Sequence, residues 1–224
     1  MQNLNVETWN KVYSEGGSLL IWPDENVVSS LNRHRGKFSK GIDLACGAGR
    51  HTMLMAQMGI DSLGVDSSEA SIEFAKNRSE SLGLKNIKFV KGLVQDLELE
   101  KESFDIVIAW GLIHYLERQD QEEFIDKVLS ILKPNGMFLL TLRSEEDTRR
   151  TSGKKIEDNR YLVDYFDSGL NEVKQTKMYF WDEAGVRKLL NGFSNLKLGH
   201  RGKEPIGSLG NKSAHWLIEA YKKG

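Results

Sequence analysis

Short apolar runs separated by helical stretches dominate the chain from residue 41 onward. The runs lie at residues 42–45, 62–65, 87–90, 104–109 and 137–142. Each is short and bounded by glycine or charged residues, which is typical of a buried parallel strand. Strands that alternate with helices predict βαβ units and a doubly wound, Rossmann-like α/β sheet.

The clearest helix is predicted over residues 120–132, where Phe124, Val128 and Ile131 repeat at helical spacing. The residues that follow it, Lys133-Pro134-Asn135-Gly136, are turn formers and predict its end. Before the alternating region, the first 35 residues predict two short helices, the second with an apolar stripe that includes Val27 and Leu31.

After residue 142 the alternation stops. Residues 143–160 are polar and charged and predict a long surface excursion, followed by a helix over 182–190. Two last strands are expected at 195–198 and 215–221, and the short connection between them permits only an antiparallel pair. We therefore expect seven strands, five of them parallel, with an antiparallel pair at the C-terminal end.

The composition of the chain excludes several classes of function. The 224 residues suit one domain, and 31 basic against 32 acidic residues give a net charge of −1, which excludes the broad basic surface of a nucleic-acid binder. A single cysteine, Cys46, excludes an internal disulfide and a multi-thiolate metal site. No apolar run approaches membrane-spanning length, and the first residues, MQNLNVETWN, lack the basic and apolar regions of a secretory signal, so a cytoplasmic protein without membrane contact is predicted.

The strongest local signal is a strand that runs into Gly47-Ala48-Gly49 and then into a helical stretch. Glycines there let a ligand approach the backbone, and the helix start presents free N–H groups. The dinucleotide fingerprint needs a third glycine, where this chain has Thr52, which disfavours a nicotinamide cofactor. Asp66 ends the next strand, 19 residues after Gly47, where a carboxylate can accept hydrogen bonds from both hydroxyls of a ribose.

Five segments, IDLACGAGR, LGVDSSEASIEFAK, VQDL, SFDIVIAWGLIHYL and LKPNGMFLLTL, occur in the order and spacing of one family. Over residues 38–142 the chain resembles the core of a class I S-adenosylmethionine-dependent methyltransferase. The resemblance implies S-adenosylmethionine as cofactor, S-adenosylhomocysteine as product, and direct in-line methyl transfer without a metal. It also implies a cofactor-binding core over 38–142, an N-terminal helical lid over 1–37, and an acceptor side with the last strands over 143–224 of a single domain.

The same resemblance implies the cofactor contacts. Asp43, Ala45 and Gly47 would flank the methionine moiety, with Cys46, Gly49 and Arg50 in the same turn; Asp66 would hold the ribose, Ser67, Val94 and Gln95 would lie by the adenine, and Ala109 and Trp110 would pass the sulfonium. The chain departs from the family at Leu93, where an acidic residue is common. The adenine contact is then left to backbone N–H groups or to Gln95.

The acceptor is expected to be a small molecule. The three prolines, Pro23, Pro134 and Pro205, exclude the Asn/Asp-Pro-Pro-aromatic loop of nucleic-acid amino methyltransferases, and no Pro-Cys pair exists for a cytosine methyltransferase. Methylation of oxygen or nitrogen is favoured over sulfur. A thiol or tellurite-type methyltransferase, a non-catalytic cofactor-binding module and a nicotinamide-dependent oxidoreductase stay open as alternatives.

His114, just past the fourth strand, is the candidate catalytic base, with a packing role as the alternative. Tyr13 and Trp22, together with Trp9, give the polar N-terminal segment aromatic faces suited to enclosing a sulfonium, or to covering the sheet. On the acceptor side, a carboxylate or phosphate could be bound by five basic residues: Arg143, Arg149, Arg150, His200 and Arg201. The alternative is that they belong to a solvated loop. Tyr179 and Trp181 are further candidates for lining the acceptor pocket. His51 and Tyr115 are weaker candidates. The oligomeric state is not predicted.

Overall fold

The computed structural model describes residues 4–17, 19–167 and 172–224. Its helices are α1 Leu4–Ser14, α2 Glu25–Arg33, α3 Arg50–Gln57, α4 Glu69–Ser81, α5 Arg118–Ile131, α6 Thr148–Ser152 and α7 Glu183–Leu189, with 3-10 turns η1 Val94–Asp96 and η2 Ile113–Tyr115. The strands are β1 Lys40–Leu44, β2 Asp61–Asp66, β3 Ile87–Lys91, β4 Phe104–Ala109, β5 Leu132–Arg143, β6 Lys154–Glu157, β7 Arg160–Asp167, β8 Glu172–Tyr179, β9 Ser194–Lys203 and β10 Ser213–Tyr221. Each strand predicted from an apolar run is present.

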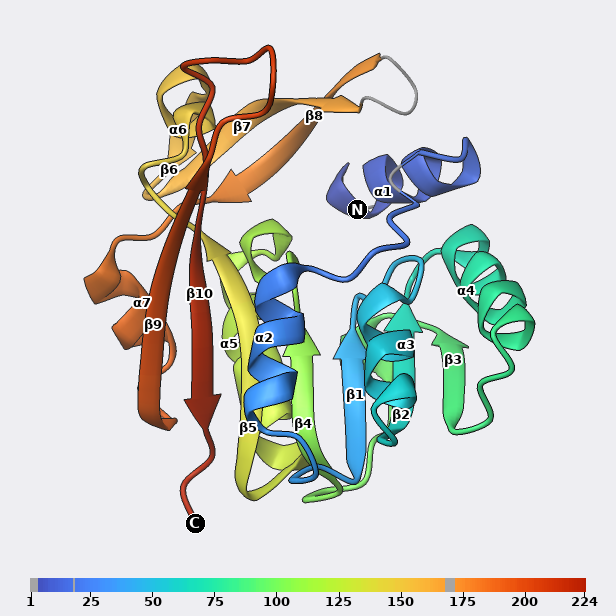
Figure 1. Cartoon of the computed structure of the whole chain (residues 1–224). Helices are drawn as coiled ribbons and strands as arrows, with labels where there is room; N and C mark the ends of the chain where they lie inside the picture. The colour runs from blue at the N-terminus through green and yellow to red at the C-terminus, as the bar shows by residue number, and fades with distance from the viewer. Residues whose placement is uncertain (1–3, 18, 168–171) are drawn as a thin grey trace.

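The main sheet has seven strands in the order β3-β2-β1-β4-β5-β10-β9 (Figure 1). Strands β1 to β5 are parallel, and β10 pairs antiparallel with both β5 and β9. The predicted fold class is therefore confirmed, with one refinement: β10 is inserted between β5 and β9. Because it runs the other way, β10 begins at the edge of the sheet where the parallel strands end.

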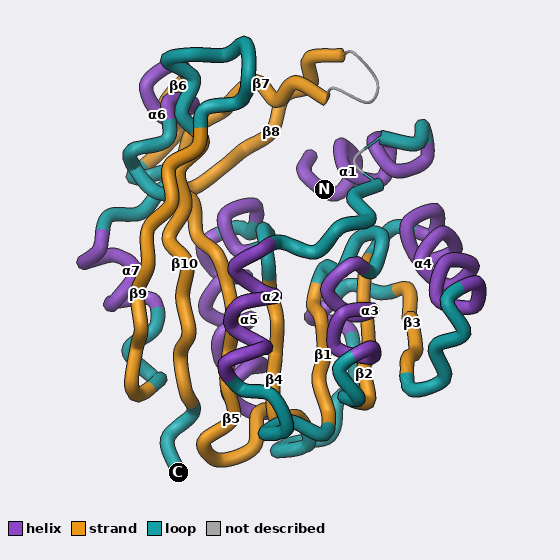
Figure 2. The backbone as a smooth tube through the Cα atoms, viewed as in Figure 1, coloured by secondary structure: helices purple, strands orange, loops and turns teal. Residues whose placement is uncertain are grey.

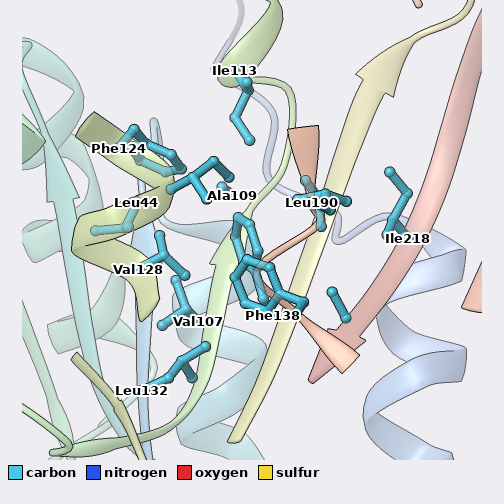
Figure 3. Packing of buried hydrophobic residues seen from close by; sticks show 14 of the residues in the cluster. Leu44, Val107, Ala109, Ile113, Phe124, Val128, Leu132, Phe138, Leu190 and Ile218 are labelled. Carbon is cyan, nitrogen blue, oxygen red and sulfur yellow. The ribbon is translucent and has the colours of Figure 1, made fainter. Parts of the chain in front are cut away.

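Helices cover both faces of this sheet. One face is closed by α2 and α3, whose Val27, Leu31 and Met55 pack on β4 and β5. The opposite face holds the larger core, in which Phe124 and Val128 of α5 contact β4 and β5 (Figure 3). Figure 2 shows α2 and α3 in front of the strands and α5 behind them. Apolar burial on both faces explains why the strands read as continuous hydrophobic runs.

Two predictions about chain boundaries need correction. The turn expected at residues 133–136 does not separate α5 from β5, because β5 begins at Leu132 and takes up these residues where its register with β4 shifts. The surface excursion expected over 143–160 is exposed for most of its length, but it is not a plain loop, because it contains α6 and β6, the first strand of a second, three-stranded sheet β6-β7-β8. Some polar residues of the 143–160 segment are buried, because the Asp147 side chain caps α6 and pairs with Arg143. A hydropathy pattern does not predict that charged residues are buried as pairs.

The second sheet and α1 both lie beyond the carboxyl ends of the parallel strands (Figure 1). Helix α1 contacts α4 and β8, so the N-terminal segment and the second sheet meet over the same edge of the main sheet. Among the described residues no helix is both long and apolar enough to span a bilayer.

Candidate active site

A cavity of about 460 Å³ lies at the carboxyl ends of the parallel strands. The strand order reverses there, between β1 and β4, which is where open α/β sheets bind their ligands. Its walls come from the segments after β1, β2, β3 and β4, from the end of β5, the start of β10, and the N-terminal segment. We call the part near β1–β3 the donor end and the part near β4, β5 and β10 the acceptor end.

The loop after β1 is shaped for close approach at the donor end. Ala45 and Gly47 adopt positive φ angles of 60° and 53°, and a Cβ atom added to Gly47 would lie 2.8 Å from the Tyr13 hydroxyl oxygen. Gly49 serves a different purpose: it is the left-handed N-cap of α3, and a Cβ there would meet the Phe89 ring at 2.7 Å. The first glycine therefore keeps the cavity open, and the second allows helix and sheet to pack.

Asp66 lies at the donor end with its side chain largely buried. Its carboxylate accepts hydrogen bonds from the Gly47 N–H at 2.8 Å, the Ser68 N–H at 2.9 Å and the Ser71 hydroxyl at 3.2 Å. Burial raises the pKa of Asp66, and these hydrogen bonds offset part of that rise. The residue fixes the glycine loop and still borders the cavity, where its oxygens can accept from a diol.

Asp43 stands behind this wall. Its carboxylate accepts from the Thr52 hydroxyl at 2.8 Å, and burial raises its pKa to about 7 against that hydrogen bond. It does not border the cavity, and neither do Gly49 and Ala109. These three residues lie behind the cavity wall and shape the loop and strand that form it; their part in cofactor binding stays a prediction.

The acceptor end gathers polar groups from distant parts of the chain. His114 of η2 is 1% exposed, and its ring centroid lies 4.3 Å from that of Tyr115 and 6.3 Å from that of His215. Thr141 of β5 accepts a hydrogen bond from the Gly111 N–H at 2.9 Å. Burial, and then the Arg143 charge, lower the pKa of His114 well below its usual value and that of His215 to about 2. Both rings are therefore neutral at pH 7.

Arg143 ends β5 at the wall of the cavity. Its Nη1 donates to Asp147 at 2.9 Å and to Ser213 at 2.8 Å, and Arg149 donates to the same Asp147 carboxylate at 2.9 Å and 2.8 Å. Burial raises the pKa of Asp147, but the two guanidinium groups lower it below its ordinary value. One carboxylate is thus shared between two cations.

The N-terminal segment borders the cavity through Trp9, Tyr13, Leu20 and Asp24. Asp24 is the N-cap of α2, its N–H donates to His51 Nε2 at 3.2 Å, and its carboxylate accepts two hydrogen bonds from Arg201. His51 is buried and also borders the cavity, and burial lowers its pKa to about 3. These bonds fasten the segment to α3 and β9.

Trp22 does not close the site. Its side chain is 76% exposed and lies outside the cavity wall, and its carbonyl oxygen accepts a hydrogen bond from Arg50. Two further acceptor-side expectations are corrected. The Tyr179 hydroxyl is bonded to Glu157 at 2.6 Å, and the His200 ring is bonded to the Ser144 hydroxyl at 2.8 Å, so both side chains are occupied away from the cavity.

Most of the predicted site residues are brought together in one wall. Those that border the cavity are Tyr13, Ala45, Cys46, Gly47, Arg50, Asp66, Ser67, Val94, Gln95, Trp110, His114 and Arg143. Sequence reasoning missed Asp24, Thr141 and His215. The signal for His215 was present, because an antiparallel last strand must begin where the parallel strands end. The described residues contain no group of three or more His, Cys, Asp or Glu side chains placed to hold a metal ion.

A family model described as a methyltransferase domain matches residues 37–185. The chain belongs to this methyltransferase family. It is similar to an uncharacterised methyltransferase of Synechocystis sp., at 32% identity over 118 residues, which cover 53% of this chain and 50% of that protein. It is also similar to a ubiquinone biosynthesis O-methyltransferase of Bartonella tribocorum, at 28% identity over 137 residues, 61% of this chain and 53% of that protein. The methyltransferase spans about half the length of these two relatives.

Solved structures agree on the fold. A methyltransferase of Methanosarcina mazei superposes with a TM-score of 0.69 at 20% identity, covering 87% of this chain and 97% of that one. The 1,6-didemethyltoxoflavin N1-methyltransferase of Burkholderia thailandensis, crystallised with its substrate and S-adenosylhomocysteine, superposes with a TM-score of 0.69 at 16% identity, covering 99% of this chain and 88% of that one.

Proposed function

We propose that this methyltransferase binds S-adenosylmethionine at the donor end of the cavity and transfers its methyl group to a small molecule at the acceptor end. The observation that carries the proposal is one continuous cavity that reaches from Gly47 and Asp66 to His114 and Arg143. A module that only bound the cofactor would need no space beyond the reacting carbon. Here that space exists and is lined by polar side chains.

The residues at the donor end fit the cofactor. The Gly47 backbone borders the cavity beside the Tyr13 hydroxyl, and Asp66 offers carboxylate oxygens to the ribose hydroxyls. The Arg50 guanidinium suits the carboxylate of the methionine moiety. Ser67, Val94 and Gln95 are left for the adenine; Leu93, which also borders the cavity, provides only apolar contact and backbone groups.

A nicotinamide cofactor fits less well. The position of the third fingerprint glycine holds Thr52, which is fully buried and bonded to Asp43. Its side chain therefore fills the interior of the helix–strand junction where the dinucleotide fingerprint uses a glycine for close packing.

When bound, S-adenosylmethionine supplies a methyl group on a positively charged sulfur. The task of the chain is to align that carbon with the acceptor and to exclude water, which can account for much of the acceleration of a direct displacement. Trp110, Leu112 and Tyr115 give the passage between the two ends aromatic and apolar walls. Trp9 and Tyr13 of α1 border it from the other side, which supports the role of residues 1–37 as a lid.

His114 is our candidate for the proton acceptor. Its neutral ring can take a proton from an acceptor hydroxyl or amine. Burial and the Arg143 charge oppose the resulting imidazolium, so this role needs negative charge nearby. The polar lining with Thr141 and Arg143 favours an oxygen or nitrogen acceptor over sulfur.

Calorimetry tests the cofactor assignment. S-adenosylhomocysteine is expected to bind with micromolar affinity and NAD not to bind; the reverse result would overturn the proposal. Incubation with methyl-labelled S-adenosylmethionine and a metabolite extract then separates enzyme from binding module. Transfer of label to a small molecule is expected, whereas binding of the cofactor without any transfer would favour the non-catalytic module.

A further inference from the structure

Three basic side chains meet at the acceptor end: His114 from η2, Arg143 from β5 and His215 from β10. Arg143 and His215 are directly paired in the register of β5 with β10, so their side chains leave the sheet on the same face. The His114 ring lies against His215, with 6.3 Å between ring centroids. All three border the cavity. The cluster is assembled by the fold from residues far apart in the sequence.

Two nitrogen atoms of this cluster are buried without a hydrogen-bond partner among the described residues: Nδ1 of His114 and Nε of Arg143. The side chains that carry them are almost entirely buried, at 1% and 9% exposure. Buried polar atoms nearly always have a partner, in the protein or in what it binds. The residues that carry these two atoms both line the cavity, so the hydrogen-bonding capacity of the cluster is not used up within the protein.

The charge of the cluster indicates which kind of ligand. Arg143 is always protonated, and the Asp147 carboxylate that faces it is shared with Arg149. The two histidines do not change this balance, because burial and the neighbouring Arg143 charge lower their pKa values and keep both rings neutral. The acceptor end thus presents a buried cation to the cavity, and Asp24, a carboxylate that also lines the cavity, is already bound by Arg201. A buried cation favours an anion.

We propose that the methyl acceptor is an oxyanion, such as a carboxylate, whose negative oxygen is held by Arg143 between His114 and His215. This rests on the proposed function, because it assigns the acceptor of that same site. Arg143 is then the specificity-determining residue: it selects anionic over neutral molecules of the same shape. The alternative is that Arg143 only ties β5 to Asp147 and Ser213.

Matched neutral and anionic probes test the inference. The complex with S-adenosylhomocysteine is titrated with acetate and benzoate and, separately, with acetamide and benzamide, with ligand-observed NMR at millimolar concentration. We expect each carboxylate to bind about tenfold or more tightly than its amide, the range of a charge-assisted hydrogen bond. Equal binding of amide and carboxylate, or no carboxylate binding to a complex that has formed, would overturn the inference and leave the cofactor assignment standing. Failure to bind S-adenosylhomocysteine would overturn both.

Variants assign the preference to its residue. Arg143→Gln should abolish the preference for carboxylates and Arg143→Lys should retain most of it, because the lysine keeps the charge. The matched control is Arg150→Gln, which removes the same charge from a residue that stacks on Tyr161 outside the cavity wall and should change nothing. Should Arg143→Gln not fold, the lysine variant and the wild-type probes still decide. A preference that survives in folded Arg143→Gln would show a purely structural role.

Discussion

At the donor end of the cavity the ligand-facing groups come from the loops after the neighbouring strands β1, β2 and β3, whereas at the acceptor end they come from residues 114, 143 and 215. The donor end holds Asp66 and backbone groups of the glycine loop, with Asp43 behind them. The acceptor end holds a guanidinium and two neutral imidazoles. Burial raises the carboxyl pKa values at one end and lowers the imidazole pKa values at the other.

This difference teaches that one cavity can offer opposite chemistry to the two molecules it brings together. Carboxylate oxygens accept hydrogen bonds and suit hydroxyl groups, whereas a buried cation suits negative charge. Under the proposed function this difference would set which ligand binds at which end, although Arg50 also brings a cation to the donor end, for the carboxylate of the methionine moiety.

Acidification is expected to show the contrast most strongly. The pKa of His215 falls from 6.5 to about 2, through burial and then the Arg143 charge, so below pH 6.5 the unfolded chain takes up a proton that the folded chain does not, and stability is lost as pH falls. The pKa of Asp43 rises from 3.8 to about 7 through burial. Between those values the folded chain holds the extra proton, and this residue makes stability rise as pH falls.

His215→Asn should therefore flatten the acid limb of the stability curve by about 1.4 kcal/mol per pH unit between about pH 4 and pH 6, and Asp43→Asn should steepen it by the same amount. Urea unfolding across that range measures both slopes. The contrast between the ends would fail if the two variants shifted the slope in the same direction.

Removal of the Asp66 carboxylate tests the donor end by itself. Asp66→Ala should weaken S-adenosylhomocysteine binding by about 1.5–3 kcal/mol, the value of a hydrogen bond to a charged group. Asp61→Ala, at the exposed start of the same strand, is the matched control and should bind normally in calorimetry. Unchanged affinity in Asp66→Ala would place the ribose elsewhere.

The glycine loop allows a comparison at constant backbone strain. Gly47 and Gly59 both have positive φ angles, but a Cβ on Gly47 would meet the Tyr13 hydroxyl at 2.8 Å, and one on Gly59 would meet nothing within 4 Å. Alanine at either position should cost about 1–2 kcal/mol of stability for the left-handed conformation. Only Gly47→Ala should also weaken cofactor binding, as calorimetry would show. Equal binding by the two variants would mean that no ligand approaches the loop.

The smallest effect is expected at Trp22, since its side chain is largely exposed. Trp22→Ala should alter S-adenosylhomocysteine affinity less than twofold, whereas Tyr13→Ala, which removes a ring from the cavity wall, should alter it more. The opposite ranking would show that the exposed indole moves onto the bound cofactor.

The donor end could be predicted from the sequence because its groups are local. The turn at Gly47 and the acid at Asp66 each follow a strand, and neighbouring parallel strands end at one edge. The lid over residues 1–37 and the base role of His114 stay predictions.

The acceptor end and the second sheet could not be predicted from the sequence, each for a physical reason. One partner of Arg143, Ser213, is brought to it by the pairing of β5 with β10, across 70 residues of sequence. The second sheet was missed because its first strand, β6, is exposed along its whole length and so lacks the apolar alternation by which a half-buried strand is recognised.

The reversed direction of β10 has a consequence for how this enzyme can diverge. His215 is the third residue of that strand, so the loop just before it tolerates changes in length without disturbing the ladder. One residue added inside the strand just after His215 would instead turn that imidazole to the other side of the sheet. Relatives that differ in loop length can thus share a substrate, while a single slip in pairing would erase the pocket that recognises it.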